Sequence, residues 1–430
     1  MKKYYLECLS CKKIIDDHYY LSCSCQNNGL LRAVYSQRNF HPTNDPSIWR
    51  FSDWLPVNKP PNGRSNQQDG QNTPGKTIVY KSKALSKTLG LKNLFIAFNG
   101  YWPERRAEIR TCTFKGLEAP PTIRRAKENG ISRMLISTAG NTGRAFAEET
   151  FNQVFQTIIV ASESASSRLW TTKESTNGQV KFISLDRDND YLDAIMLGKR
   201  ICEELTIAPE GGAKNVARRD GMGTCFLESV AEIGYIPNHY FQAIGSGTGG
   251  IAAWEAALRI RQDGRFGNHL PQLHLSQNKK FDPIVRAWKA KRNKLVPEDL
   301  TLAREKMSSL YAEVLANRNP PYHIVGGVYE ALLDTNGRTY SVSEKEAIRA
   351  TKLFQNTEEI DIVPPAAVAV ASLIQAVEMN AVQPKDTILL NITGGGIERI
   401  KEDLAIIPIK PEIKIPSIRG SLKEIKEIVN

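Results

Sequence analysis

Three short segments rich in small polar residues have the composition of anion-binding loops. The first, residues 137–143, reads Ser-Thr-Ala-Gly-Asn-Thr-Gly and lies between an apolar run ending at Ile136 and a helical pattern. The first N–H groups of a helix lack intrahelical partners, so this segment predicts a site for a substrate carboxylate. An ordinary capped turn is the alternative. The residues expected to contact substrate here are Ser137, Thr138, Ala139, Gly140, Asn141 and Thr142.

The second segment follows an apolar run at residues 240–244 and precedes another helical pattern. Its glycines allow the backbone to form a nest of N–H groups around a phosphate. It also fits the dinucleotide pattern G-x-G-x-x-G, but the next predicted strand leads into Ser276 and Gln277 rather than an acidic residue. The segment therefore favours a lone phosphate and leaves NADP open. Its residues are Gly245, Ser246, Gly247, Thr248, Gly249 and Gly250.

The third segment, Thr-Gly-Gly-Gly at residues 393–396, follows the apolar run 387–392. Glycines at a strand end indicate close approach of the backbone to a ligand or to another segment. Thr393 has a hydroxyl that could hydrogen-bond to a heterocyclic nitrogen, although a tight turn would explain the segment equally well. Lys115, within Cys-Thr-Phe-Lys-Gly, precedes a predicted helix, and by pattern alone such a lysine is usually a solvated charge.

The order of these four pieces resembles that of fold-type-II pyridoxal phosphate (PLP) enzymes, from about residue 72 to about residue 402. Residues 72–74 and 89–94 are similar to the threonine synthase branch. The resemblance implies that PLP is the cofactor and that Lys115 is the Schiff-base lysine. It also implies that Asn141 contacts the ring hydroxyl, that residues 245–250 hold the phosphate, and that Thr393 faces the pyridine nitrogen.

The lysine segment departs from the threonine synthases, which usually read Pro-Thr-Gly-Ser-Phe-Lys-Asp. Here residues 109–116 read Ile-Arg-Thr-Cys-Thr-Phe-Lys-Gly, and together with residues 98–104 and 117–122 they resemble the cysteate synthase family. This resemblance implies β-replacement, with O-phospho-L-serine and sulfite giving L-cysteate and phosphate, in coenzyme M biosynthesis. Freed Lys115 would take and return the Cα proton. A neutral Thr393 would favour replacement over transamination.

Other functions stay open. Threonine synthase uses O-phosphohomoserine and water, and an O-phosphoserine-dependent cysteine synthase uses sulfide. A protein of another class would keep the fold and bind a partner or RNA without catalysis, although the intact Lys115 and loops argue against it. A nicotinamide enzyme is the least favoured. Arg110 and Arg144 lie beside the motifs and could bind phosphate or sulfite, but each could equally be a surface residue.

The N-terminal cysteines predict a small ribbon that could hold a structural zinc. Four of the seven cysteines fall within the first 25 residues, a crowding that in a reducing compartment suggests metal. Cys8 and Cys11 have the spacing of a zinc knuckle. The second pair, Cys23 and Cys25, is one residue closer than usual, so a ribbon without metal is the alternative.

Composition is typical of a globular protein: 430 residues, 41% hydrophobic and 24% charged, with a formal net charge of +11. The basic residues are spread along the chain, which suits small anionic ligands rather than nucleic acid. The run 289–294 is predicted to be an exposed helix face. The start of the chain lacks the pattern of a signal peptide, and the apolar stretch 360–377 contains Asp361 and two prolines. We therefore expect a cytoplasmic protein without membrane contact, and the family resemblance suggests a homodimer.

Apolar runs alternate with helical patterns, which predicts an α/β fold with mostly parallel sheets. With the resemblance, we expect a tryptophan synthase β-like fold of two open αβα domains and a small ribbon. The predicted strands are 94–98, 133–136, 156–160, 181–184, 240–244, 272–275 and 387–392, and the predicted helices are 118–129, 143–155, 190–204 and 250–262. The expected units are the ribbon (1–35), an extended linker (36–84), a smaller domain (85–215) and a larger one (216–430). The tail after Pro408 is predicted to be a surface arm or short docking helix.

Overall fold

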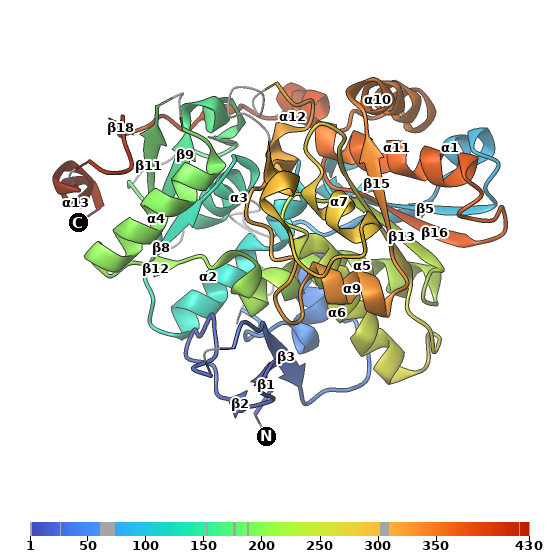
Figure 1. Ribbon diagram of the computed structural model, residues 1–430, viewed down its shortest axis with the longest axis horizontal. Coiled ribbons are helices and arrows are strands. Elements are labelled where there is room, and N and C mark those ends of the chain that lie inside the picture. Colours follow the sequence, from blue (N-terminus) through green and yellow to red (C-terminus); the bar gives the residue numbers. More distant parts are fainter. Residues whose placement is uncertain are drawn as a thin grey trace.

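Two open sheets form the body of the chain (Figure 1). The computed structural model describes residues 2–25, 27–60, 74–151, 154–174, 178–186, 189–301, 309–420 and 422–429. The larger sheet has the order β15-β14-β13-β16-β5-β4, and only the β4–β5 pair is antiparallel. Its strands are β4 (Ile78–Lys81), β5 (Asn93–Phe98), β13 (His239–Ala243), β14 (Gln272–Asn278), β15 (Arg338–Val342) and β16 (Thr387–Ile392).

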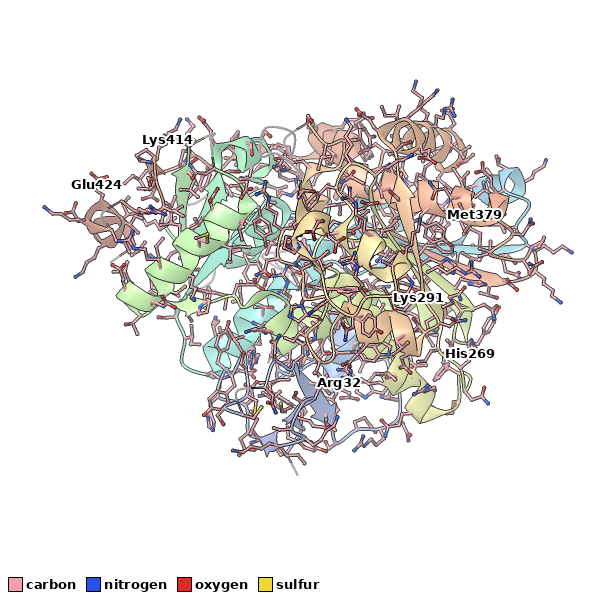
Figure 2. All side chains as sticks on the ribbon, in the orientation of Figure 1. Arg32, His269, Lys291, Met379, Lys414 and Glu424 are labelled. Atoms are coloured by element: carbon pink, nitrogen blue, oxygen red, sulfur yellow. The ribbon has the colours of Figure 1, made fainter. Side chains whose placement is uncertain are left out.

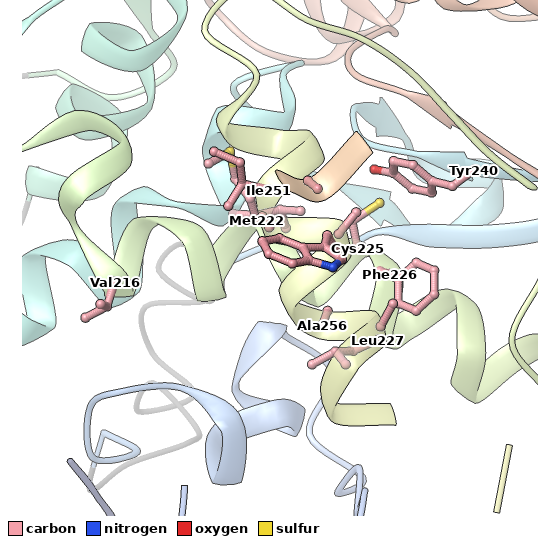
Figure 3. Packing of buried hydrophobic residues seen from close by; sticks show 14 of the residues in the cluster. Val216, Met222, Cys225, Phe226, Leu227, Tyr240, Ile251 and Ala256 are labelled. Carbon is pink, nitrogen blue, oxygen red and sulfur yellow. The ribbon is translucent and has the colours of Figure 1, made fainter. Parts of the chain in front are cut away.

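Helices cover both faces of this sheet, as its buried strands require. Successive side chains point to opposite faces: Tyr240 and Leu389 pack with α5 (Val216–Ile233) and α6 (Thr248–Asp263), as Figure 3 shows for Tyr240. Their neighbours Phe241 and Leu390 pack with α10 and α11 on the other face. The remaining helices of this part are α1 (Ala84–Thr88), α7 (Pro283–Lys289), α9 (Val328–Asp334), α10 (Glu344–Glu358), α11 (Pro364–Glu378) and α12 (Ile397–Asp403).

The smaller sheet is parallel throughout and has the order β12-β8-β9-β11-β18. Its strands are β8 (Arg133–Ser137), β9 (Gln156–Ser162), β11 (Val180–Leu185), β12 (Ala208–Pro209) and β18 (Ile413–Ile415). Its helices are α2 (Ala119–Glu128), α3 (Asn141–Thr150), α4 (Tyr191–Leu205) and α13 (Lys423–Val429). The C-terminal tail thus supplies an edge strand, and α13 buries Ile425 and Val429 against the α4 face of the sheet. The predicted arm is part of the sheet.

The N-terminal ribbon is an antiparallel sheet of order β2-β1-β3, with β1 at Tyr4–Cys8, β2 at Ile14–Ile15 and β3 at Leu31–Tyr35. It shares a hydrophobic core with α5 and α6. Fully buried Arg219 on α5 donates to the Leu31 carbonyl and, at 2.9 Å, to Glu255 Oε2 on α6. The guanidinium therefore fixes the ribbon to the larger domain.

The α/β fold and all the strands predicted from the sequence are present, with bounds that differ by a few residues. The prediction of a helix face at residues 289–294 is wrong, because α7 ends at Lys289 and the chain then turns at Lys291, which adopts a left-handed φ of 53°. Figure 2 shows Lys291 on this exposed turn. Among the described residues no helix is both long and apolar enough to cross a membrane.

Chain order and sheet membership differ at two places. β4 and β5 lie in the larger sheet although they precede the smaller one in the chain, and β18 lies in the smaller sheet although it follows the larger one. The division at 1–35, 36–84, 85–215 and 216–430 stays a prediction. Residues 61–73, which include part of the predicted linker and two residues of the threonine synthase-like stretch 72–74, lie outside the described residues. The short strands are β6 (Tyr101–Trp102), β7 (Ala107–Glu108), β10 (Trp170–Thr171) and β17 (Ile407–Pro408).

A chain of hydrogen bonds crosses the amino-terminal half of the larger sheet. Buried His274 lies between the His239 ring (Nε2 to Nδ1, 3.0 Å) and the Tyr340 hydroxyl (2.7 Å from Nδ1), and His239 Nε2 is 3.1 Å from Asp386. Burial holds the pKa of His274 well below its usual 6.5, and the charges of His239 and Arg338 add to that effect. The folded chain therefore keeps His274 neutral.

This arrangement predicts a loss of stability in acid. Below about pH 6.5 the unfolded chain binds a proton at His274 that the folded chain does not, so the unfolding free energy should fall by about 1.4 kcal/mol per pH unit for this group. His274→Gln should make the free energy flatter with pH between about pH 6.5 and about pH 5. Denaturant unfolding at several pH values measures it, with exposed His269→Gln as the control (Figure 2). Equal slopes in both variants would contradict the prediction.

Candidate active site

One cavity gathers the three loops and Lys115. The loops follow β8, β13 and β16, so they lie at the carboxyl ends of parallel strands, where open α/β sheets bind ligands. The cavity encloses about 780 Å³ of empty space, including the part open to solvent. The predicted residues that line it are Lys115, Thr138, Ala139, Asn141, Thr142, Gly245, Ser246, Gly247, Thr248, Gly249 and Thr393.

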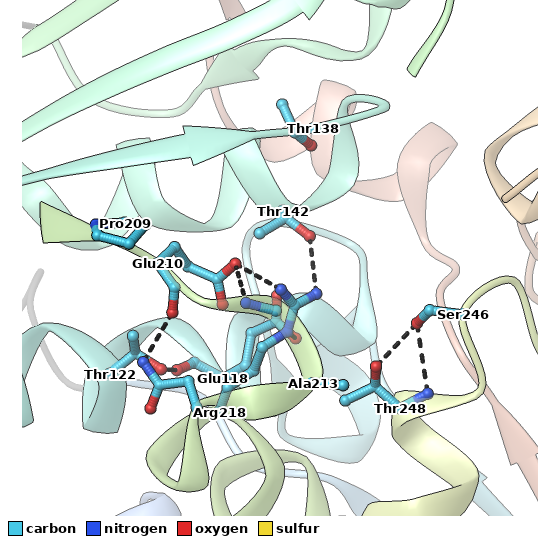
Figure 4. Close-up of polar contacts among 12 residues, drawn as sticks. Glu118, Thr122, Thr138, Thr142, Pro209, Glu210, Ala213, Arg218, Ser246 and Thr248 are labelled. Carbon is cyan, nitrogen blue, oxygen red and sulfur yellow. Dashed lines mark hydrogen bonds and ion pairs between the residues drawn. The ribbon is translucent and has the colours of Figure 1, made fainter. Parts of the chain in front are cut away.

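The glycine loop 245–249 brings the N-terminus of α6 to the cavity. Gly247 has a φ of +82°, and a Cβ at Gly249 would lie 2.2 Å from Gln242 Nε2, so both positions require glycine. Ser246 Oγ accepts from the Thr248 N–H at 3.3 Å and lies 2.8 Å from Thr248 Oγ1 (Figure 4). The first N–H groups of this 16-residue helix have no intrahelical acceptors and suit a phosphate. Gly250 instead packs against Leu275 of the sheet.

The loop 137–143 is held by its own side chains. Thr138 Oγ1 accepts from the N–H groups of Gly140 (2.9 Å) and Gly143 (3.1 Å), which fixes the turn into α3. Ser137 points away from the cavity and donates to the Ala194 carbonyl on α4 at 2.9 Å. Asn141 Oδ1 accepts from the Arg144 guanidinium at 3.3 Å, which leaves the amide N–H groups of Asn141 to donate to a ligand.

Thr393 ends β16 with a buried hydroxyl that has no hydrogen-bond partner among the described residues. Its carbonyl accepts from the Phe114 N–H at 2.9 Å, and this bond places the lysine segment beside the loop. A Cβ at Gly394 would lie 2.5 Å from the Cys112 carbonyl, so the two segments need glycine there to approach. A buried hydroxyl without a partner is unfavourable, and a polar ligand atom in the cavity would satisfy it.

Lys115 lies in a short 3-10 turn, Phe114–Leu117, that precedes α2. Its Nζ is 3.4 Å from Glu118 Oε2 and 3.6 Å from Met222 Sδ, and 23% of its side chain is exposed to the cavity. Burial lowers the pKa of the Lys115 ammonium, an effect that Glu118 opposes and Arg218 increases. A lysine with a lowered pKa can serve as a nucleophile and base.

Three buried charged residues beside Lys115 were not predicted from the sequence (Figure 4). Arg218 on α5 donates to Glu118 Oε2 at 3.0 Å, to Glu210 Oε2 at 2.6 Å and to Thr142 Oγ1 at 3.5 Å. Although burial alone would lower it, the two carboxylates raise the pKa of Arg218, so its charge is fixed. A signal was available: Arg218, Arg219 and Asp220 interrupt an otherwise apolar helix and had to be paired.

The two arginines predicted to bind phosphate or sulfite do not line this cavity. Arg144 is buried with its guanidinium 4.4 Å from the centre of the Trp170 ring, and burial lowers its pKa to about 10. Arg110 lines a separate cavity with Glu108, Glu148 and Lys173. Arg218, rather than either of them, brings a guanidinium to Lys115.

The four N-terminal cysteines converge despite the short spacing of the second pair. All four Sγ atoms lie within 4.8 Å of one another, with Cys8–Cys25 at 3.8 Å and Cys11–Cys23 at 3.7 Å. Zn–S bonds of about 2.3 Å in a tetrahedron place sulfurs about 3.8 Å apart, so the donor set fits zinc. The group that the sequence resemblance implies also fits the cavity, since an amine, a helix N-terminus and an unpartnered hydroxyl all face it.

Known proteins of two kinds are similar to this chain. A family model described as "Pyridoxal-phosphate dependent enzyme" matches residues 71–394. The cysteate synthase of Methanocella paludicola is 47% identical over 430 residues, which is 100% of this chain and 98% of that protein. The cysteate synthase of Methanosarcina mazei is 47% identical over 427 residues, 99% of this chain and 100% of that protein.

Solved structures with low sequence identity share the fold. A serine racemase from Dictyostelium discoideum has a TM-score of 0.53 at 13% identity and covers 75% of this chain and 92% of its own. A bacterial-type threonine deaminase structure has a TM-score of 0.53 at 15% identity and covers 74% and 92%. These likenesses confirm the predicted fold class.

The cysteine cluster predicts about one zinc per chain. Each thiolate contributes to binding, so Cys11→Ser should lose most of the metal and lower the thermal stability of the ribbon. Metal analysis of the purified chain and the visible absorbance of a cobalt-substituted sample measure this. Cys202→Ser, which lies outside the cluster, is the matched control. A wild-type chain that is purified without metal and takes up neither ion would contradict the prediction.

Proposed function

Because the chain belongs to the cysteate synthase family of pyridoxal-phosphate-dependent enzymes, we propose that it converts O-phospho-L-serine and sulfite into L-cysteate and phosphate with Lys115 as catalytic residue. The observation that carries this is the cavity itself: Lys115, an amine with a lowered pKa, faces two anion-binding loops and Thr393. The identity to cysteate synthases extends over the whole chain, which favours this reaction over those of threonine synthase and cysteine synthase.

Four elements would hold PLP. Lys115 would bind it covalently, the loop 245–249 with the start of α6 would take the phosphate, the Asn141 amide would donate to the ring hydroxyl, and Thr393 would meet the ring nitrogen. When bound, PLP supplies an electron sink for the carbanion that forms at the substrate Cα. A neutral hydroxyl at Thr393 makes that sink weaker than a carboxylate would, which suits elimination and replacement.

The side chains of the cavity then perform binding and proton transfer. The loop 138–142 would bind the substrate carboxylate through the N–H groups at the start of α3. Freed Lys115 takes the Cα proton on Nζ while the Cβ–O bond breaks and phosphate leaves with its electron pair. The sulfur lone pair of sulfite forms the new bond to Cβ, and Lys115 returns the proton to Cα. Atoms and charge balance without any further reactant.

Arg218 is the guanidinium closest to these events, whereas Arg110 and Arg144 have no place in the proposal as ligands of sulfite. Arg144 acts indirectly, since it holds the Asn141 amide. We also keep zinc in the ribbon, a homodimer, a cytoplasmic location and a role in coenzyme M biosynthesis as predictions from the family.

The assignment of Lys115 predicts a spectroscopic change. Wild-type chain incubated with PLP and then dialysed should keep a visible absorbance band, whereas Lys115→Ala should lose that band because no other amine faces the cavity among the described residues. Lys87→Ala, an exposed lysine on α1, is the control and should behave as wild type. An unchanged band in Lys115→Ala would remove Lys115 from the proposal.

Product analysis tests the substrates. The loaded chain should form L-cysteate and phosphate only when both O-phospho-L-serine and sulfite are present, and Lys115→Ala should reduce the rate by about a hundredfold or more. Parallel assays replace sulfite with sulfide, and O-phospho-L-serine with O-phospho-L-homoserine in water. Faster turnover in either parallel assay would assign the chain to a different reaction, and a retained visible band without turnover in all three would indicate a non-catalytic protein.

A further inference from the structure

Glu118 is a buried carboxylate that two cations share. Its side chain is fully buried, and its Oε2 atom lies 3.4 Å from Lys115 Nζ and 3.0 Å from Arg218 Nε. Its second oxygen, Oε1, has no hydrogen-bond partner among the described residues. Glu118 is therefore bound to the cluster through one oxygen and retains unused capacity to accept a proton-bearing group.

The charges of the cluster balance only when Lys115 is protonated. Two cations, Lys115 and Arg218, face two carboxylates, Glu118 and Glu210, and the Arg218 charge is fixed by its ion pairs at 3.0 Å and 2.6 Å. When Lys115 is neutral, the cluster carries one uncompensated negative charge in a site largely shielded from solvent. Uncompensated buried charge is strongly unfavourable, so the cluster favours the return of a proton to Nζ.

Resting on the proposed function, we propose that Glu118 is a positioning residue which holds Lys115 Nζ toward Arg218 and favours the protonated form of the freed lysine. In the reaction the Cα–H bond breaks, its proton moves to Nζ, and the departing phosphate takes the electron pair of the Cβ–O bond. Proton uptake by Lys115 restores the neutrality of the cluster, so Glu118 and Glu210 assist that transfer without touching the substrate.

The other groups around Lys115 determine how large the effect is. Arg218 opposes protonation of Lys115, Glu210 favours it from the far side of Arg218, and the uncharged Met222 lies 3.6 Å away. Tyr191 lines the same cavity from α4, and burial raises the pKa of its hydroxyl, which therefore stays neutral near pH 7. Glu118 is thus the strongest influence in favour of the ammonium form.

The test measures Lys115 directly in full-length chain without cofactor or substrate. Acetic anhydride reacts with the amine but not the ammonium form, and mass spectrometry of the Lys115 peptide gives the labelling rate at each pH. Glu118→Gln should move the midpoint of that curve down by about one pKa unit or more, so that labelling below the midpoint is about tenfold faster. Glu210→Gln should shift the midpoint in the same direction by less.

Glu148→Gln is the matched control, because Glu148 is also a buried glutamate but bonds to Thr171 and Thr172 outside this cavity. Its midpoint should equal that of wild type. In turnover, Glu118→Gln should lower kcat more than it changes KM, since the substrate does not contact Glu118. A purely structural role would instead reduce the fraction of folded chain and leave the midpoint where it is.

Unchanged midpoints in Glu118→Gln and Glu210→Gln would overturn the proposal. If Glu118→Gln does not fold, Glu118→Asp retains the charge at a greater distance and should give a smaller downward shift, and an unshifted curve there would overturn it as well. The labelling curve is independent of the nucleophile. A chain that shows the shift but forms no L-cysteate would therefore contradict the proposed reaction and leave the role of Glu118 intact.

Discussion

The pairing of buried charge around Arg218 is the constraint on which the site depends. Arg218 belongs to α5 of the larger domain, whereas Glu118 precedes α2 and Glu210 follows β12, both beside the smaller sheet. Removing one partner of a buried ion pair typically costs about 3–5 kcal/mol, since it leaves the other charge unpaired. The three residues consequently hold the two sheets in one relative position, and the loops at their carboxyl ends face a common cavity.

Within that frame, backbone geometry prepares the cavity for anions. The glycines at 247 and 249 allow α6 to begin where its N-terminus faces the cavity, and Thr138 fixes the turn into α3. The bond from the Phe114 N–H to the Thr393 carbonyl ties the lysine turn to the end of β16. This last contact joins segments far apart in the chain, so the position of Lys115 depends on the assembled fold rather than on its own short turn.

The ribbon is attached to this frame by a second buried arginine. Arg219 pairs with Glu255 and also donates to a carbonyl of β3, one residue along α5 from Arg218. Adjacent residues on one helix thus fix the ribbon on one side and the catalytic cluster on the other. A change in the packing of the ribbon would act on α5, and through it on the charges beside Lys115.

The sequence by itself determined the alternation of strands and helices, the three loops and, by family resemblance, the identity of Lys115. These are local properties: hydrophobic period, glycine content and short motifs are written in neighbouring residues. Only the tertiary structure decided which charged residues reach the cavity. Glu118 and Arg218 are 100 positions apart in the chain, and the same packing that joins them keeps Arg110 and Arg144 away. It also pairs β18 with β11 across more than half the chain, because long-range contacts follow from complementary buried surfaces that no local pattern encodes.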